Sequence, residues 1–322
     1  MRIKTTFYLT LILSVGFMTQ SFLSDFRIAG ITPEREAMIK KYSEVPREEM
    51  EKDPALMNEL KARYKQHIAT MNQKIGSTGG KFVVMFMTPE VGVNMTNVQR
   101  MSRAFLKASC QELGVDFIDV TKNFGDDLKA ITNQPIDGHF SKAGAKIIAA
   151  DLEKMLPKYA AQKATATYTN RPAVFGDQAP NQNQVMDLGK KLPFRLVTNK
   201  QGLRQNHEVT FPKTKTRFLF MGDSGFFFPF MDNADMAHEV LQAKMPQFDF
   251  NNACNWGYAI DDYISLWDER AKYVEPDVVV MQTSGSDIID MYFSNRNRFS
   301  RNPQAQQPTA LEKAYYERNY KK

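Results

Sequence analysis

Short apolar runs that alternate with helical stretches constrain the fold of this chain more than any other feature of its sequence. Runs of this length are typical of strands that are buried on both faces of a sheet. Helical stretches between such runs are the usual crossover connections of parallel strands. The runs are Lys81–Met87, Val115–Val120, Arg217–Met221, Phe248–Cys254 and Val278–Gln282.

The alternation predicts an α/β domain with a doubly wound, parallel five-stranded sheet and helices on both faces. The strand Arg217–Met221 is expected at the centre of this sheet, flanked by the two runs that follow it, with the first two runs completing the far side. Apolar residues at helical spacing predict helices at Val98–Leu113, Ser141–Leu156, Asp235–Lys244 and Ile260–Tyr273. Further helices are expected at Glu34–Tyr42, Pro46–Ile75 and Pro308–Tyr320.

A polar segment divides the chain. Residues 158–193 are rich in Ala, Thr, Asn, Gln and Pro and lack apolar periodicity, which is typical of a linker or a long surface excursion. We therefore expect residues 26–157 and residues 194–322 to be two halves of one domain that this segment joins.

The amino terminus has the layout of an export signal. Arg2 and Lys4 precede an apolar run from Phe7 to Met18. No small-residue cleavage site follows cleanly, and the run can extend to Leu23. Residues 1–25 are therefore interpreted as a cleaved signal peptide or as an uncleaved membrane anchor through residues 7–23. Both alternatives predict a periplasmic, cell-surface or secreted protein.

Charge and cysteine content narrow the remaining classes. The formal net charge of +6 is spread along the chain without a block of like charges, which argues against a nucleic-acid partner. Cys110 and Cys254 are the only cysteines. In an exported protein they could form a disulfide, but two separate buried thiols are the preferred interpretation.

The sharpest local signal is Gly222-Asp223-Ser224, directly after the strand Arg217–Met221. Ligands of open α/β sheets bind beyond the carboxyl ends of the strands, so Ser224 is a candidate nucleophile. A serine nucleophile needs a neighbouring base, and that base needs a partner that fixes its tautomer. The alternative is a simple turn from strand to helix.

His139 is the candidate base. It lies in a loop between the second predicted strand and the helix that begins at Ser141, with Asp137 two residues before it. Asp137 could fold back and orient the imidazole, or it could only form an Asx turn near the start of that helix. The other histidines, His67, His207 and His238, lie in charged or polar surroundings where a packing or solvated role is expected.

These motifs together resemble the SGNH (GDSL-type) hydrolases. Gly222-Asp223-Ser224 resembles the first block of that family, and Asp137-Gly138-His139 resembles the block that carries its acid and base. Gly257 resembles the glycine of the second block, and Ser286 stands where the third block usually has an asparagine. The resemblance implies a Ser224–His139–Asp137 triad and an oxyanion hole at Ser224 and Gly257, with Ser286 or Asn255 as a further donor.

The blocks occur in an unusual order, with the histidine block before the serine block. A circular permutation accounts for this order, and it is similar to the arrangement in the polysaccharide O-acetylation proteins of the alginate type. The resemblance implies an exported serine ester hydrolase or O-acyltransferase that acts on an acylated small molecule or polysaccharide, with acetyl as the expected group. The chemistry requires no metal or organic cofactor.

Two departures from the family pattern favour a competing hypothesis. Loss of one oxyanion donor at Ser286 typically costs a factor of about a hundred to a thousand in rate. In addition, a run of phenylalanines follows shortly after the candidate nucleophile, at Phe226, Phe227, Phe228 and Phe230. The alternative is therefore a weakly active or inactive scaffold or binding protein of the cell envelope.

Overall fold

The computed structural model describes residues 52, 54–187 and 189–291. The predicted export segment and the helices expected at residues 34–42 and 308–320 lie outside these residues. Among the described helices, none is long and apolar enough to cross a bilayer.

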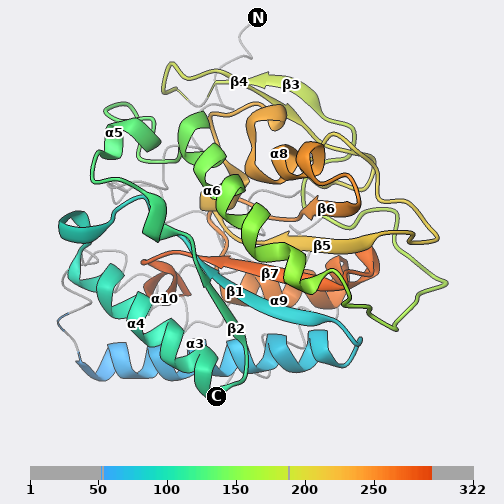
Figure 1. Ribbon diagram of the computed structural model, residues 1–322, viewed down its shortest axis with the longest axis horizontal. Helices are drawn as coiled ribbons and strands as arrows, with labels where there is room; N and C mark the ends of the chain where they lie inside the picture. Colours follow the sequence, from blue (N-terminus) through green and yellow to red (C-terminus); the bar gives the residue numbers. More distant parts are fainter. Residues whose placement is uncertain (1–51, 53, 188, 292–322) are drawn as a thin grey trace, which may run out of the picture.

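The core of the protein is a parallel sheet of five strands (Figure 1). The strands occur in the order β2-β1-β7-β5-β6. Their bounds are Lys81–Phe86 for β1, Asp116–Asp119 for β2, Thr216–Met221 for β5, Phe248–Asn252 for β6 and Val278–Thr283 for β7. The predicted fold class, a five-stranded α/β sheet, is confirmed.

The predicted neighbours of the serine strand are also confirmed, since β5 pairs with β6 and β7. The predicted order is confirmed as well, because β1 and β2 complete the side of the sheet beyond β7; within this order the middle position belongs to β7 rather than to β5. The first and second strands of the chain lie together on one side of β7, so β5 is displaced toward the opposite edge.

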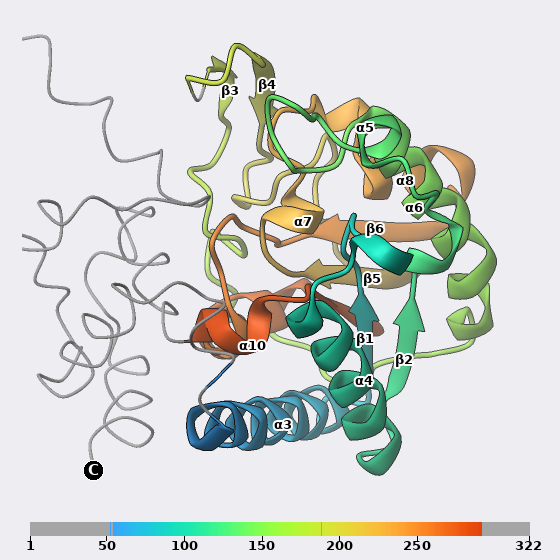
Figure 2. The ribbon, with the colours of Figure 1, turned by 90° about the vertical axis from the view of Figure 1, so that its left-hand side faces the viewer.

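Helices cover both faces of the sheet, as expected. One face packs against α3 (Pro54–Gly76), α4 (Asn97–Glu112) and α9 (Ile260–Glu269), and the other packs against α6 (Lys142–Met155) and α8 (Ala237–Lys244) (Figures 1 and 2). Alternate side chains of each strand enter the two cores, as the period of a strand requires. In β1, for example, Val84 lies in the first core and Val83 in the second.

Local sequence determines where several of these helices begin. The Thr96 side chain accepts a hydrogen bond from the Gln99 N–H and the Gln99 side chain accepts one from the Thr96 N–H, a capping box that starts α4. Ser141 caps α6 through a hydrogen bond from the Gly144 N–H. Short helices fill the turns at α5 (Leu128–Ile131), α7 (Ser224–Phe227) and α10 (Asp287–Asp290). Single 3-10 turns occupy Gly92–Asn94, Thr121–Asn123, Leu156–Tyr159, Asn233–Asp235 and Ala271–Val274.

The polar segment contains a strand that the sequence did not predict. Its strand β3 (Asn183–Met186) pairs antiparallel with β4 (Phe194–Val197). The residues of β3 are largely exposed, so the pairing rests on backbone hydrogen bonds and leaves no apolar period to detect. Earlier in the segment, the Ala164 N–H donates to Asp277 at 2.7 Å and the Tyr168 N–H donates to Glu275 at 2.9 Å, which fixes it beside the start of β7.

The two cysteines are free and buried. Cys110 packs in the core beneath α4, whereas Cys254 packs in the core on the other face of the sheet. The disulfide alternative is therefore wrong, and the expectation of two separate thiols is confirmed.

Candidate active site

Ser224 stands at the carboxyl end of β5, where the chain turns into α7. Asp223 caps this short helix by accepting a hydrogen bond from the Gly225 N–H at 2.7 Å. The Asp223 N–H in turn donates to the side-chain carbonyl oxygen of Gln282 at 2.9 Å. The turn is thus fixed to the end of the neighbouring strand β7, and Ser224 keeps partial solvent exposure.

Gln282 explains why residue 222 is glycine. A Cβ atom at Gly222 would lie 2.4 Å from Gln282 Oε1, a separation that side chains do not tolerate. On the other side of the turn, the Asn255 N–H donates to the Gly222 carbonyl at 3.0 Å. The sequence analysis identified Gln282 only as the last residue of a strand. Its polar side chain at the end of an apolar run was the feature that could have indicated this role.

Asp137 and His139 form a hydrogen-bonded pair in the loop before α6. His139 Nδ1 lies 2.5 Å from Asp137 Oδ1, and the same oxygen accepts the His139 N–H at 2.8 Å. Burial raises the pKa of Asp137, but the hydrogen bonds from His139, its charge and that of Lys190 outweigh this effect and lower the pKa below its usual value. The ionised form of Asp137 is therefore favoured, and its hydrogen bonds fix the orientation of the His139 ring.

The serine turn and the Asp-His loop lie side by side. The His139 ring contacts the Phe230 ring at a centroid distance of 6.1 Å, and Phe140 contacts Phe228 at 6.5 Å. His139 also lies close enough to Asp223 to lower the pKa of that carboxyl group. The fold therefore brings the predicted nucleophile and base, which come from separate halves of the chain, to one edge of the sheet.

Ser224 and His139 do not form a hydrogen bond in the part of the chain that the structure describes. Catalytic hydrogen bonds are commonly long in proteins without substrate and shorten when the substrate binds. The Asp137–His139 pair and the serine turn thus lie close together, but the hydrogen bond between His139 and Ser224 is not formed.

The loop after Ser224 is held in an unusual conformation. Phe228 and Phe230 have positive φ angles of 52° and 65°, which bulky side chains rarely adopt. The buried guanidinium of Arg204 donates to the main-chain carbonyls of Phe227, Phe228 and Met231, the last at 2.5 Å. Burial lowers the pKa of Arg204 to about 9, against the opposing charge of Asp232.

The aromatic residues after Ser224 divide into two groups. Phe226, Phe227 and Phe228 are fully buried, which confirms that most of this run packs in the core. Phe230 is partly exposed and faces His139. Phe230 is thus the member of the run that borders the candidate site.

The role of Arg204 was missed because an arginine in a polar stretch gives no sign that it will be buried.

Apart from Ser224, which follows β5, the predicted oxyanion residues lie in turns that follow the two strands adjacent to β5. Gly257 has a φ of 69°, in the left-handed region that suits glycine. Asn255 uses its side-chain oxygen to accept from Gln178 at 2.8 Å, while its Nδ2 is buried without a partner among the described residues. Ser286 is partly exposed, and its hydroxyl lies 3.3 Å from that of Ser284. Their roles as donors stay predictions.

Two carboxyl groups with raised pKa values lie at the serine turn: Asp223, which is partly exposed, and the buried Asp287. Burial raises the pKa of Asp223 to about 6, against the opposing hydrogen bond from Gly225. Burial and the charge of Asp223 raise the pKa of Asp287 well above its usual value. Asp287 accepts from the Ser284 hydroxyl at 2.5 Å, and its other oxygen has no partner among the described residues. Burial and repulsion between neighbouring carboxylates therefore shift both carboxyl groups toward the protonated form, Asp287 the more strongly.

The other histidines have partners outside this site. His67 pairs with Asp261 at 2.7 Å, and His207 lies between Glu239 and Asp249 at 3.9 and 3.5 Å. His238 is buried beside Asn252 and Glu239. Over the described residues, no group of three His, Cys, Asp or Glu side chains is arranged to hold a metal ion.

Comparisons with known proteins give structural matches alone. No protein-family model matches the chain, and no curated protein matches it. Among solved structures, the chain is similar to the O-acetyltransferase domain of Pseudomonas putida AlgJ, with 14% identity and a TM-score of 0.45 over 73% of this chain and 85% of that one. It is also similar to Pseudomonas aeruginosa AlgX, with 10% identity and a TM-score of 0.41 over 68% of this chain and 56% of that one.

Proposed function

We propose that this protein is an exported serine ester hydrolase or O-acyltransferase. The observation that supports this most is the Asp137–His139 pair, with Nδ1 and Oδ1 at 2.5 Å, packed through Phe230 beside the turn that presents Ser224. Nothing in the folding of the sheet requires an ionised carboxylate, an imidazole and a serine at these positions. A nucleophile, a base and an orienting group at one strand edge are the elements of acyl transfer.

In the proposed reaction, Ser224 Oγ attacks an acyl carbonyl carbon while His139 Nε2 accepts the hydroxyl proton. Asp137 stabilises the imidazolium that forms. The main-chain N–H groups of Ser224 and Gly257 are the proposed donors to the tetrahedral oxyanion, with Asn255 or Ser286 as a further donor. His139 then returns the proton to the departing alkoxide, which leaves an acyl-serine.

The second half of the reaction decides between hydrolase and transferase. Water or a sugar hydroxyl attacks the acyl-serine, His139 takes the proton of the attacking group, and Ser224 Oγ regains a proton when the acyl group leaves. The sequence motifs that resemble polysaccharide O-acetylation proteins favour an acetyl group and a carbohydrate partner. The layout of residues 1–25, a basic start before an apolar run, supports the export part of the proposal.

The competing function is a cell-envelope scaffold or binding protein that keeps the fold without the chemistry. Two observations favour it. Ser224 and His139 form no hydrogen bond in the described residues, and Ser286 stands where the resembled family has an asparagine donor. Such a protein would conserve the shape of the site and lack an activated serine.

Covalent labelling separates the two functions. Purified protein is treated with a fluorophosphonate, and the adduct is measured by intact-mass spectrometry. We expect one adduct on the wild-type protein and on the control variant Ser77→Ala, whose serine is exposed in the turn that follows α3, and none on Ser224→Ala. Absence of an adduct on folded wild-type protein would establish the scaffold function instead.

A further inference from the structure

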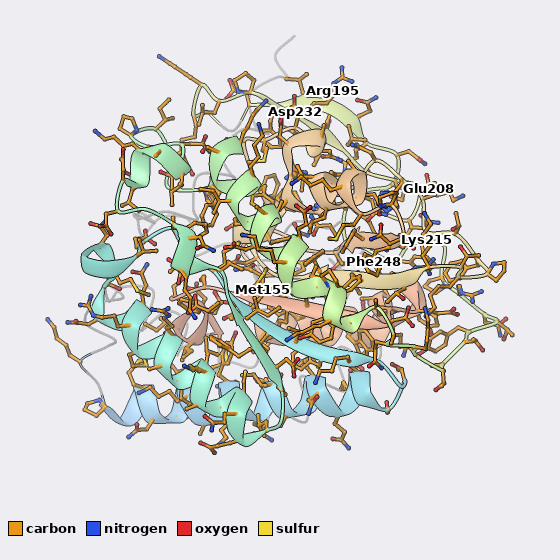
Figure 3. The ribbon with its side chains drawn as sticks, in the orientation of Figure 1. Met155, Arg195, Glu208, Lys215, Asp232 and Phe248 are labelled. Atoms are coloured by element: carbon orange, nitrogen blue, oxygen red, sulfur yellow. The ribbon has the colours of Figure 1, made fainter. Side chains whose placement is uncertain are left out.

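A groove runs along the outer edge of β2, the edge strand that is separated from β5 by β1 and β7. Its volume is about 710 Å³. Its walls come from α4 on one side and from α6 with the turn that follows it on the other. In Figure 1 this edge faces the viewer, with β2 between α4 and α6, and Figure 3 marks Met155 on the α6 side. The groove is therefore distinct from the serine site.

The groove carries a strong positive charge. Its lining contains one acidic residue, Asp119, which is already bound by the Arg103 guanidinium at 2.7 Å. Lys107 and Lys122 are exposed and have no ion-pair partner among the described residues. Lys154 and Lys158 pair with Asp151 and Asp116, which lie outside the lining, at 3.8 and 3.4 Å. The cations without a carboxylate partner among the described residues are therefore Arg100, Lys107 and Lys122, and they favour an anionic occupant. The basic lining residues are Arg100, Arg103, Lys107, Lys122, Lys154 and Lys158.

The backbone of β2 is open along the same groove. The Val120 N–H donates to Phe86 O at 3.3 Å. The even-numbered residues along β2 therefore direct their backbone N–H and C=O groups toward β1. In a parallel pair the alternate residues, Phe117 and Asp119, direct their N–H and C=O groups away from that neighbour. No other backbone group in the described residues bonds to them. Such an edge is a template for an additional strand.

We propose that the groove binds an acidic, extended segment of a partner protein, which adds to the sheet as a sixth strand beside β2. The open backbone groups select a polypeptide, because an anionic sugar chain would satisfy the cations and leave the strand edge unpaired. Phe117 and Met155, both partly buried in the lining, offer apolar contacts to alternate side chains of that segment. Because β2 has four residues, the paired segment spans roughly 13 Å.

The proposal predicts a measurable affinity for a peptide of alternating glutamate and valine. A fluorescein-labelled eight-residue peptide of this kind is titrated with the full-length protein in low salt, and binding is followed by fluorescence anisotropy. We expect saturable binding that weakens by about tenfold or more in the double variant Lys107→Glu/Lys122→Glu, because attraction becomes repulsion at two sites. The matched control Lys200→Glu/Lys215→Glu makes the same change of charge on exposed residues outside the groove and should bind within about twofold of wild type.

Two further probes separate strand addition from simple anion binding. The same peptide with alternate backbone nitrogens methylated keeps its charge but cannot complete the strand pairing, and we expect its affinity to fall about tenfold or more. An oligouronate of equal charge should bind more weakly than the unmodified peptide. Equal binding of the methylated peptide, tighter binding of the oligouronate, or no binding of the unmodified peptide would each overturn the proposal. Serine labelling should be unchanged in the Lys107→Glu/Lys122→Glu variant, so this test is independent of the proposed function.

Discussion

Replacement of Asp137 by asparagine tests the electrostatic role of this carboxylate. Its Oδ1 atom accepts hydrogen bonds from the His139 ring nitrogen Nδ1 and from the His139 main-chain N–H. The side-chain oxygen of an asparagine can accept hydrogen bonds from the same two groups. The substitution therefore removes mainly the negative charge. The two side chains are only 3% and 17% exposed, so the lost attraction to an imidazolium is only partly screened. At a charge separation of about 4 Å and an effective dielectric constant near 20, that attraction is worth about 4 kcal/mol.

A loss of about 4 kcal/mol in the transition state corresponds to a fall of about a thousandfold in the acylation rate. The rate is measured as hydrolysis of p-nitrophenyl acetate and as the rate of fluorophosphonate labelling, with thermal unfolding as the check that the variant is folded. The control is Asp127→Asn, which removes a carboxylate that caps α5 and does not contact His139. Retention of at least a tenth of the wild-type rate by folded Asp137→Asn would refute the assigned role.

Two further predictions concern the serine turn. Gly222→Ala should lower the free energy of unfolding by about 1–3 kcal/mol, because the new methyl group overlaps its neighbour, whereas Gly138→Ala, with nothing within 4 Å of the added atom, should stay within about 0.5 kcal/mol of wild type in urea titrations. Equal effects of the two would contradict the packing described here. Because burial raises the pKa of Asp223 to about 6, the folded state binds this proton more tightly than the unfolded state. The stability should therefore fall as pH rises from about 4 to 6, by up to about 1.4 kcal/mol per unit, and this contribution should be constant above pH 6. Urea titrations from pH 4 to 7 should show a shallower dependence in Asp223→Asn, and an unchanged slope would refute the assignment.

Much of the candidate site was predictable because it depends on local pattern. An apolar run that ends in Gly222-Asp223-Ser224 places the serine at a strand end, and two-residue spacing allows Asp137 to reach the His139 ring. Glycine proved unnecessary at position 138, since a side chain there meets nothing. The partners of these residues were not predictable, because Gln282 and Arg204 act across the fold and carry no local signature.

The sequence by itself determined the class of fold and the identity of its strands. Apolar runs and helical periods are properties of neighbouring residues, and burial on two faces follows from them. Only the tertiary structure decided that β7 lies at the centre, that the two cysteines lie on opposite faces, and that a polar hairpin forms at β3 and β4. It also decided that the outer edge of β2 has no neighbouring strand and is lined by basic side chains. These features depend on which distant segments of the chain pack together. That choice is determined by the energy of the whole core and not by any local sequence pattern.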